Sequence, residues 1–490
     1  MISVFLREQK RYTQEDLVKE FHCSEEKTVR ILKRLKEYGV LKAVKANDNQ
    51  KDLTDLVDED IEIADVEVGE NEYLYVITFV GVITIEGRVL KCYPKYLLDA
   101  TAPKAELKQV LKVLEKYNSK EQIIRMYNDT SDSSAFNMLA VMLFLLQDYF
   151  EYGPYTNTQD IIETNGSGDI LWDKTINETF ALLSNNRPYY PELLTVKRVN
   201  DDFDFFKRLH ECILTHCTTE LRDADLLDLF DIMGVDISDE QIEDFGDKEY
   251  VLDRIIKELN IQFNTRKQLL LKTLYAYIAN RSALDDLDCF SMFGTNSFNL
   301  VWERVCAEVM DNQLQKPIGG LRLPVPLAEQ YRDLRHKKLI DLIDKPQWSG
   351  TAPNDERFMK QAEDTLIPDL VSIVNIDDEY QFIIFDAKYY NIQLEHNKKL
   401  RGQPGIESIT KQYLYQLAYQ PFVEAHKIGI VRNCFLMPTA STEIIEKGTV
   451  YLDMLSKLGL QDIQIRLLPA QTMYRHYIEN TKMDIRTLNL

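Results

Sequence analysis

The sequence predicts a multidomain chain that mixes helices and strands, of the α/β or α+β class. Its 490 residues are enough for about three domains of ~150 residues each. Residues 1–46 show helical periodicity leading into a strand, and residues 366–391 hold two apolar runs joined by turn residues. We therefore expect an N-terminal helix-turn-helix, a β-rich and helical middle region, and a C-terminal sheet flanked by helices.

Changes in composition and periodicity set the expected domain boundaries. Residues 52–72 carry ten acidic side chains and no Lys or Arg, which favours a solvated linker that repels DNA. Residues 73–85 and 88–93 are dense in β-branched and aromatic side chains around Glu86-Gly87, which predicts a hairpin. The expected divisions are an N-terminal domain (1–46), an acidic linker (47–72), a hairpin with helices (73–160), a mostly helical region (161–290) and a C-terminal domain (291–490).

Composition favours a cytoplasmic protein with no membrane partner. The hydrophobic content of 45% and charged content of 28% are those of an ordinary soluble chain. The most apolar segment, residues 138–146, is far shorter than the ~20 residues that span a bilayer, and the N-terminus lacks the apolar core of a signal peptide. Seven cysteines without paired spacing fit a reducing compartment. A net charge of −21 disfavours a chain that grips DNA over its whole surface.

The first 46 residues differ from the rest, because they carry 11 Lys and Arg against 7 Asp and Glu. Thr13 and Ser24 each precede an acidic first turn, which is typical of a helix N-cap. The two helices and the strand that follows resemble a winged helix-turn-helix. Docking of the second helix on DNA and packing against a protein both remain open. The basic side chains expected on that helix are Lys27, Arg30, Lys33 and Arg34.

The C-terminal hairpin, within residues 366–391, carries the chemistry. Asp369 opens its first strand directly after Pro368, and Asp386 and Lys388 close the second. A spacing of two places Asp386 and Lys388 on the same face of a strand. Carboxylate oxygens suit Mg²⁺, and a nearby ammonium can orient water or offset charge on a phosphate. The alternative is a buried strand that ends in a polar turn with an exposed Asp386–Lys388 ion pair.

Two helices beside this hairpin add candidates. Residues 298–310 form a helical pattern in which Glu303 borders an apolar stripe, and residues 408–419 form a second that carries Lys411 and Gln412. Taken singly, each also fits a surface helix with polar residues. Four side chains of types that bind metals occur on another predicted helix. Because side chains on one helix do not converge on a single point, a partly buried helix is favoured over a zinc site. They are His210, Cys212, His216 and Cys217.

Together these motifs form a recognisable pattern. Glu303 in a helix, Pro368-Asp369, Asp386-Ala387-Lys388, and then Lys411-Gln412 in a helix resemble the core of the PD-(D/E)xK nuclease superfamily. Four further segments resemble the LlaJI-type restriction endonucleases, which are relatives of McrC. These segments are residues 79–83 (FVGVI), 168–176 (GDILWDKTI), 300–303 (LVWE) and 411–415 (KQYLY).

The resemblance covers residues 73–490 and implies Mg²⁺-dependent cleavage of double-stranded DNA in defence, with Mn²⁺ able to replace Mg²⁺. It implies Asp369 and Asp386 as metal ligands, Glu303 as a direct or outer ligand, and Lys388 beside the attacking water. Gln412 would support the site or touch DNA, because an amide hydrogen-bonds both water and phosphate.

The resemblance also implies a partner, an McrB-like AAA+ GTPase, and dimerisation of the nuclease is a further expectation. A partner that supplies most of the DNA grip would account for the acidic chain. Local DNA contacts, or alternatively a solvated charged face, are expected at Lys398, Lys399, Arg401 and Lys411, and at Arg332, Arg335, Lys337 and Lys338.

Two other functions remain open. One is an inactive subunit that binds DNA and a partner. The other is a winged-helix transcriptional regulator, which deletion of residues 1–46 is expected to separate from a nuclease, because only the nuclease would keep its catalytic capacity.

Overall fold

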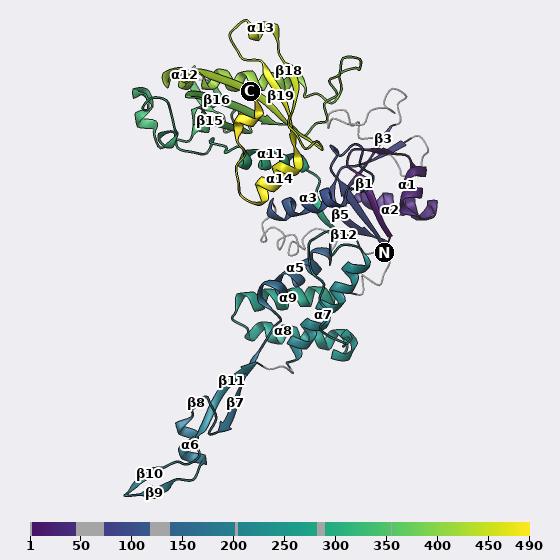
Figure 1. Cartoon of the computed structure of the whole chain (residues 1–490), viewed down its shortest axis with the longest axis vertical. Coiled ribbons are helices and arrows are strands. Elements are labelled where there is room, and N and C mark those ends of the chain that lie inside the picture. Colours follow the sequence, from purple (N-terminus) through teal and green to yellow (C-terminus); the bar gives the residue numbers. More distant parts are fainter. Residues whose placement is uncertain (1, 46–72, 118–137, 201–203, 282–289, 354) are drawn as a thin grey trace. The chain divides into compact units, whose positions relative to one another are not determined.

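The computed structural model describes residues 2–45, 73–117, 138–200, 204–281, 290–353 and 355–490 (Figure 1). The expected acidic linker, residues 47–72, lies outside the described residues. The chain divides into two compact units, and its mixture of helices and sheets confirms the predicted α+β class. The middle unit comprises Met1, Thr84–Gly87 and Asp129–Met292, and the main unit comprises Ile2–Ile83, Arg88–Asn128 and Phe293–Leu490.

Helices α1 (Gln14–Phe21) and α2 (Glu25–Glu37) begin at the two predicted N-caps. The Thr13 hydroxyl accepts from the backbone N–H of Asp16 at 3.1 Å, which satisfies a donor that the helix leaves unpaired. The strands on either side of the two helices belong to a three-stranded antiparallel sheet. Its strands, in spatial order, are β2 (Arg11–Tyr12), β4 (Tyr73–Ile77) and β3 (Leu41–Lys45).

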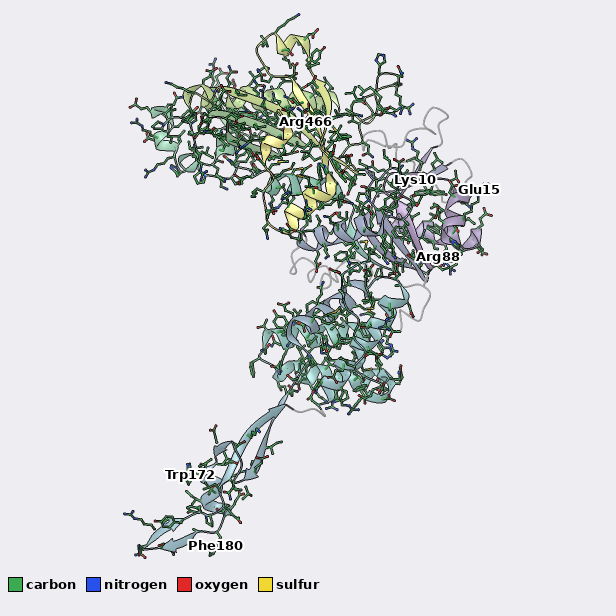
Figure 2. All side chains as sticks on the ribbon, viewed as in Figure 1. Lys10, Glu15, Arg88, Trp172, Phe180 and Arg466 are labelled. Carbon is green, nitrogen blue, oxygen red and sulfur yellow. The ribbon has the colours of Figure 1, made fainter. Side chains whose placement is uncertain are left out.

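The N-terminal segment is not a separate module. Strand β1 (Ile2–Arg7) pairs in parallel with β6 (Arg88–Tyr93) over its whole length, from Ile2 opposite Arg88 to Arg7 opposite Tyr93. Buried Arg88 also donates to the carbonyl of Phe21 at 2.7 Å (labelled in Figure 2). The first 45 residues therefore share backbone pairing with segments that follow the expected linker. The sheet order is β1, β6, β5 (Val80–Ile85), β12 (Phe290–Thr295).

Residues 73–85 form two strands, whereas the sequence predicted one. Strand β4 joins the three-stranded sheet, while β5 pairs with β6 in the four-stranded sheet. The break falls at Thr78, whose backbone N–H donates to the carbonyl of Val40 at 2.9 Å and whose hydroxyl also reaches that carbonyl. The predicted turn between β5 and β6 is confirmed, with φ of 46° at Glu86 and 75° at Gly87.

The middle unit contains long helices and several strands. Helix α5 packs on α7 and α9, and the Arg266 guanidinium is 2.8 Å from the buried Asp148 carboxylate, which ties α9 to α5. The expected boundary at residue 160 falls inside a strand, β7. The helices are α5 (Met138–Tyr152), α7 (Phe205–Asp223), α8 (Lys248–Ile261) and α9 (Thr265–Asn280).

Between α5 and α7 in the sequence, the chain forms a ribbon of strands. Strands β7 (Thr158–Thr164) and β11 (Leu194–Asn200) pair antiparallel, and β8 (Asp169–Ile170) adds to β11. The chain between them forms α6 (Trp172–Glu178) and the hairpin of β9 (Leu182–Ser184) and β10 (Arg187–Tyr189), at the end of the ribbon (Figure 1). No helix among the described residues is long and apolar enough to cross a bilayer.

A five-stranded mixed sheet forms the centre of the C-terminal part. The first two strands form the predicted hairpin, β16 pairs in parallel with β17, β17 pairs in parallel with β19, and β18 is antiparallel. The hairpin turn is Asp377-Asp378, with φ of 50° and 66°. The spatial order is β15 (Leu370–Ile376), β16 (Glu379–Ala387), β17 (Ile430–Thr439), β19 (Ile463–Pro469) and β18 (Ile445–Val450).

Helices cover this sheet. Helix α12 (Ile406–Ala425) packs on β16 and β17, and α11 (Phe298–Val309) packs on β16. Helix α14 (Ala470–Ile478) packs on β19, on α11 and on α3 (Lys104–Tyr117), so α3 belongs to this layer. Three short elements complete the region: β13 (Gln347–Thr351), β14 (Arg357–Gln361) and α13 (Asp453–Ser456).

The C-terminal end is held by one buried cation. Arg466 on β19 is 4% exposed (labelled in Figure 2), and its guanidinium donates to the carbonyls of Leu488 and Asn489 at 2.7 and 2.6 Å. Charge-assisted hydrogen bonds of this kind are stronger than neutral ones, so the last residues are fixed against the sheet.

Candidate active site

The two predicted aspartates lie opposite each other at one end of the hairpin. Leu370 is paired with Phe385, so the next residues along the two strands are Asp369 and Asp386. One carboxylate oxygen of Asp369 accepts from the backbone N–H of Ala387 at 2.8 Å, which locks the start of β15 onto the end of β16. Hairpin register therefore brings together two acids that are separated along the chain by the length of both strands.

Lys388 joins this pair. Its ammonium is 3.0 Å from the Asp386 carboxylate, whose side chain is 7% exposed. The backbone N–H of Lys388 donates to the carbonyl of Leu436 on β17 at 2.9 Å, so the segment continues the strand beyond its formal end. The predicted alternation, with Asp386 and Lys388 on one face, is what the structure shows. The pair is mostly buried, unlike the exposed ion pair of the alternative interpretation.

The charges at this corner are strongly coupled. Burial, the charge of Asp386 and a hydrogen bond shared with Asp386 raise the pKa of Asp369 well above its usual range. Burial lowers the pKa of Lys388, but the neighbouring Asp386 and Asp369 outweigh it, so the net shift is upward and the ammonium is retained. Two carboxylates held this close favour a shared proton or a bound cation, because they cannot both ionise at low cost.

Glu303 on α11 lies near this corner. Burial raises its pKa, Lys388 lowers it, and the charge of Asp386 raises it further, so the carboxyl is within electrostatic reach of both. Among the described residues, however, no group of three or more His, Cys, Asp or Glu side chains is close enough to hold a metal ion. The structure thus brings Asp369, Asp386 and Lys388 together, while Glu303 stands beside them.

Gln412 on α12 is fully buried. Its amide nitrogen donates to the carbonyl of Ile384 on β16 at 2.7 Å, two residues before Asp386. In this position it braces the strand that carries Asp386 and has no exposed surface to offer DNA. Tyr415, one turn further along α12, donates to the carbonyl of Ile367 at 3.0 Å and so braces the segment that leads into Asp369.

A cavity of about 250 Å³ lies beside Lys388 and Glu303, and we call it the Lys388 cavity; neither Asp369 nor Asp386 lines it. Its walls come from five parts of the main unit: the N-terminal segment, the end of β4, the loop after β6, the start of α11 and the end of β16. The lining residues that bear on function are Gln9, Lys42, Asn296, Asn299, Glu303 and Lys388. A larger cavity of about 770 Å³ lies toward the opposite end of β15, beside Ile373 and Asn375, and none of the five predicted catalytic residues lines it.

A buried polar cluster forms one wall of the Lys388 cavity, and sequence reasoning missed it. The hydroxyl of Tyr389, the residue after Lys388, donates to the Glu8 carboxylate at 2.6 Å. The Lys95 ammonium donates to Gln9 at 2.8 Å and lies 4.7 Å from the centre of the Tyr389 ring. Because these residues lie far apart in the chain, no local pattern could have identified them.

The expected DNA-contacting cations stay predictions. On α2, Arg30 and Lys33 are exposed, whereas Lys27 and Arg34 are half-buried. Near the sheet, Lys398 pairs with Glu395 at 2.6 Å and Lys411 pairs with Glu407 one helical turn away. Exposed pairs of this kind contribute roughly 0–1 kcal/mol, so a DNA phosphate can displace them. The remaining expected contacts are Lys399, Arg401, Arg332, Arg335, Lys337 and Lys338.

His210 and Cys212 have structural partners. The ring Nδ1 of His210 accepts from the backbone N–H of Tyr155 at 3.0 Å, and the Cys212 thiol donates to the carbonyl of Glu240. Both side chains are fully buried, which agrees with the interpretation of this helix face as part of the core of the middle unit.

Comparison with known proteins places this chain among restriction enzymes. A sequence model of the LlaJI restriction endonuclease family matches residues 79–324 and 331–471. The type II restriction enzyme BsuMI component YdjA of Bacillus subtilis (strain 168) is 26% identical over 413 residues, which cover 83% of this chain and 81% of that protein.

Chains from two solved assemblies match this chain in the comparison of structures. A half-complex of Thermococcus gammatolerans McrB AAA+ hexamers with bound McrC matches at a TM-score of 0.37 and 11% identity, covering 98% of this chain and 99% of that one. The cryo-EM structure of the McrBC complex from the same organism matches at a TM-score of 0.26 and 13% identity, covering 62% of this chain and 85% of that one. Since the family match spans well over half of the sequence, the chain belongs to the LlaJI restriction endonuclease family and is a restriction endonuclease subunit of a restriction system.

Proposed function

We propose that this chain is the DNA-cleaving subunit of its restriction system and that it hydrolyses phosphodiester bonds with Mg²⁺. The observation that carries the proposal is the convergence of Asp369, Asp386 and Lys388 at one end of the β15–β16 hairpin. In this proposal the five-stranded sheet with α11 and α12 is a PD-(D/E)xK nuclease core, and the N-terminal helices with their sheet are a winged helix.

The donor set fits a hard divalent cation. Asp369 and Asp386 supply carboxylate oxygens, which Mg²⁺ and Mn²⁺ accept, and their mutual repulsion is the kind that a bound cation relieves. Glu303 would join through water, because it stands beside the two aspartates without forming a three-acid cluster with them. When bound, the cation lowers the pKa of a coordinated water and offsets the charge that develops on the phosphate.

The side chains of the chain then have distinct roles. Asp369 and Asp386 would hold the cation, and their positions are fixed by the hairpin register and by the N–H of Ala387. Lys388 stays protonated beside Asp386, where it orients the attacking water and stabilises the pentacovalent phosphorus. The water oxygen bonds to phosphorus as the P–O bond to the leaving sugar oxygen breaks; the water releases a proton to solvent and the leaving oxygen takes up a proton from solvent. Gln412 and Tyr415 keep the two strands in place.

We further propose that an AAA+ GTPase partner binds at the end of the β7–β11 ribbon. Large apolar side chains are exposed there, which is unusual for a surface that faces only water. Phe180 is 75% exposed and Leu183 is 78% exposed, and Trp172 also projects from the ribbon (Figure 2). A partner that covers these side chains and grips DNA would also account for a nuclease subunit with a net charge of −21.

The test is cleavage of supercoiled plasmid by the purified chain with and without its partner and GTP, in a titration of Mg²⁺. We expect Asp386→Asn and Lys388→Ala to lower the cleavage rate at least ~100-fold, because each removes a group that acts on the reacting phosphate. Both variants should remain folded at the assay temperature and keep the partner complex, although loss of one partner of a buried ion pair lowers the melting temperature. Cleavage at the wild-type rate by either variant refutes the assignment, and a wild-type chain that binds DNA and partner but never cuts identifies an inactive subunit.

A further inference from the structure

The Lys388 cavity contains a second lysine that the proposed chemistry does not use. Lys42, on β3, lines this cavity together with Lys388 and Glu303, although it belongs to the N-terminal segment. Its side chain is half-buried, and it makes no ion pair with a carboxylate of the described residues. A partly desolvated ammonium without an acidic partner favours an anion, because its charge is poorly compensated.

The acidic and amide groups on the same wall are already engaged. Glu8 accepts from the Tyr389 hydroxyl at 2.6 Å and from the backbone N–H of Lys95 at 3.2 Å. Gln9 accepts from the Lys95 ammonium at 2.8 Å. Glu8 and Gln9 therefore already accept hydrogen bonds from Tyr389 and Lys95, and Lys42 is a second cation, beside Lys388, that can face an incoming ligand.

Two exposed amides complete the lining. Asn296 lies just before α11 and Asn299 lies in its first turn, and both line the cavity. Each amide offers two donors and an acceptor, which suits sugar oxygens and base edges alike. The volume of about 250 Å³ is slightly below the ~300–1,000 Å³ of pockets for drug-sized ligands, so it fits one nucleotide and excludes a base pair.

We propose that the Lys388 cavity binds the nucleotide next to the scissile phosphate, and that Lys42 contacts a phosphate of that same DNA strand. The inference rests on the proposed nuclease function and adds to it a substrate-positioning residue from the N-terminal segment. Asn296 and Asn299 bind the sugar or base of that nucleotide. The N-terminal segment thereby takes part in holding DNA at the catalytic corner itself, separately from any contact made by α2.

The experiment measures DNA binding in a full-length chain that carries Lys388→Ala, so that the probe stays intact. Binding of a fluorescein-labelled 30-bp duplex is followed by anisotropy over a series of salt concentrations. Adding Lys42→Met removes the charge and keeps the length of the side chain. We expect a dissociation constant ~5–10-fold higher and a slope of log affinity against log salt that is smaller in magnitude by about 0.9, the value for one lost phosphate contact.

Two further variants make the result specific. Lys42→Arg should retain the affinity and the salt slope, because it keeps the charge. Lys457→Met removes an exposed lysine at the end of α13 and should change the affinity less than twofold. The inference is overturned if Lys42→Met leaves affinity and slope unchanged, or if Lys457→Met changes both equally. Failure of the nuclease proposal is a separate outcome, seen as a wild-type chain that does not cut plasmid in Mg²⁺ at any partner concentration.

Discussion

At the scale of single residues, burial decides what each polar group does. Asp386 and Asp369 share one corner and are held there by Lys388 and the N–H of Ala387. Gln412 carries the same amide group as Asn299, yet it is fully buried against β16, whereas Asn299 faces a cavity. The residue types alone suggested a DNA contact for Gln412. In the structure, the buried amide of Gln412 cannot reach a ligand, whereas the exposed amide of Asn299 lines the cavity.

Tyr389→Phe tests the wall of the Lys388 cavity. The substitution takes one hydrogen-bond donor away from the buried Glu8 carboxylate, which keeps the N–H of Lys95, and a hydrogen bond to a charged group contributes about 1.5–3 kcal/mol. We expect a free energy of unfolding lower by that amount in urea denaturation, and slower cleavage because Tyr389 follows Lys388. Tyr451→Phe, at a tyrosine that is 56% exposed, is the matched control and should change neither quantity. Equal stability of the two variants contradicts the prediction.

His210→Asn tests the pH dependence of the middle unit. Burial, with a smaller effect of Arg266, lowers the pKa of His210 from 6.5 to about 3. Below pH 6.5 the unfolded chain binds a proton that the folded chain excludes, so stability falls by about 1.4 kcal/mol per pH unit down to pH ~3. Asn can still accept from the N–H of Tyr155 but does not titrate. Denaturation of both proteins at pH 7 and pH 5 should show a smaller loss for the variant; an equal loss means that His210 is not the group responsible.

At the scale of elements, local patterns located helices and hairpins, and pairing placed them in sheets. The caps at Thr13 and Ser24 and the turn at Asp377-Asp378 were predicted from local sequence and are confirmed. The division of residues 73–85 between two sheets was not predictable. The break at Thr78 depends on hydrogen bonds to the carbonyl of Val40. Val40 is distant in the sequence, so local patterns around Thr78 cannot predict this contact.

The apolar end of the β7–β11 ribbon offers an element-scale test. Phe180→Ser combined with Leu183→Ser removes two exposed side chains that make little contact with the fold. We expect the melting temperature to change by less than about 3 °C, since each exposed substitution costs within ±0.5 kcal/mol. Binding to the AAA+ partner, measured by calorimetry, should weaken at least ~10-fold. A matched change at Ile256 and Ile261 on α8, which are also exposed, should leave binding intact; equal loss from both pairs argues against the ribbon as the partner surface.

At the scale of the whole molecule, the N-terminal segment is built into the main unit. Strand β1 pairs with β6, β4 lies between β2 and β3, and Glu8 bonds to Tyr389 beside the catalytic corner. From the sequence we expected that deletion of residues 1–46 would separate a regulator from a nuclease. The structure shows that this deletion cannot make the distinction. The deletion removes part of two sheets together with the wall of the Lys388 cavity.

This integration gives a final prediction. A chain that begins at residue 47 should lose the cooperative unfolding of the main unit, because β6 is left with an unpaired edge and buried Arg88 loses its contact with Phe21. Differential scanning calorimetry should show the main-unit transition lowered by at least ~10 °C or absent. A truncated chain with a wild-type transition and wild-type cleavage shows that the segment is dispensable after all.

Sequence by itself determined the chemistry of the candidate site: two aspartates and a lysine at hairpin ends, at spacings that strand alternation and turn residues fix locally. It also determined the main helices, because caps and apolar periodicity act over a few residues. Only the tertiary structure decided that Lys42, Asn296 and Tyr389 meet at that site, and that the first strand belongs to the same unit as the last. Those contacts join residues that are far apart in the chain. Strand register and packing decide which of these side chains meet, and local sequence preferences do not.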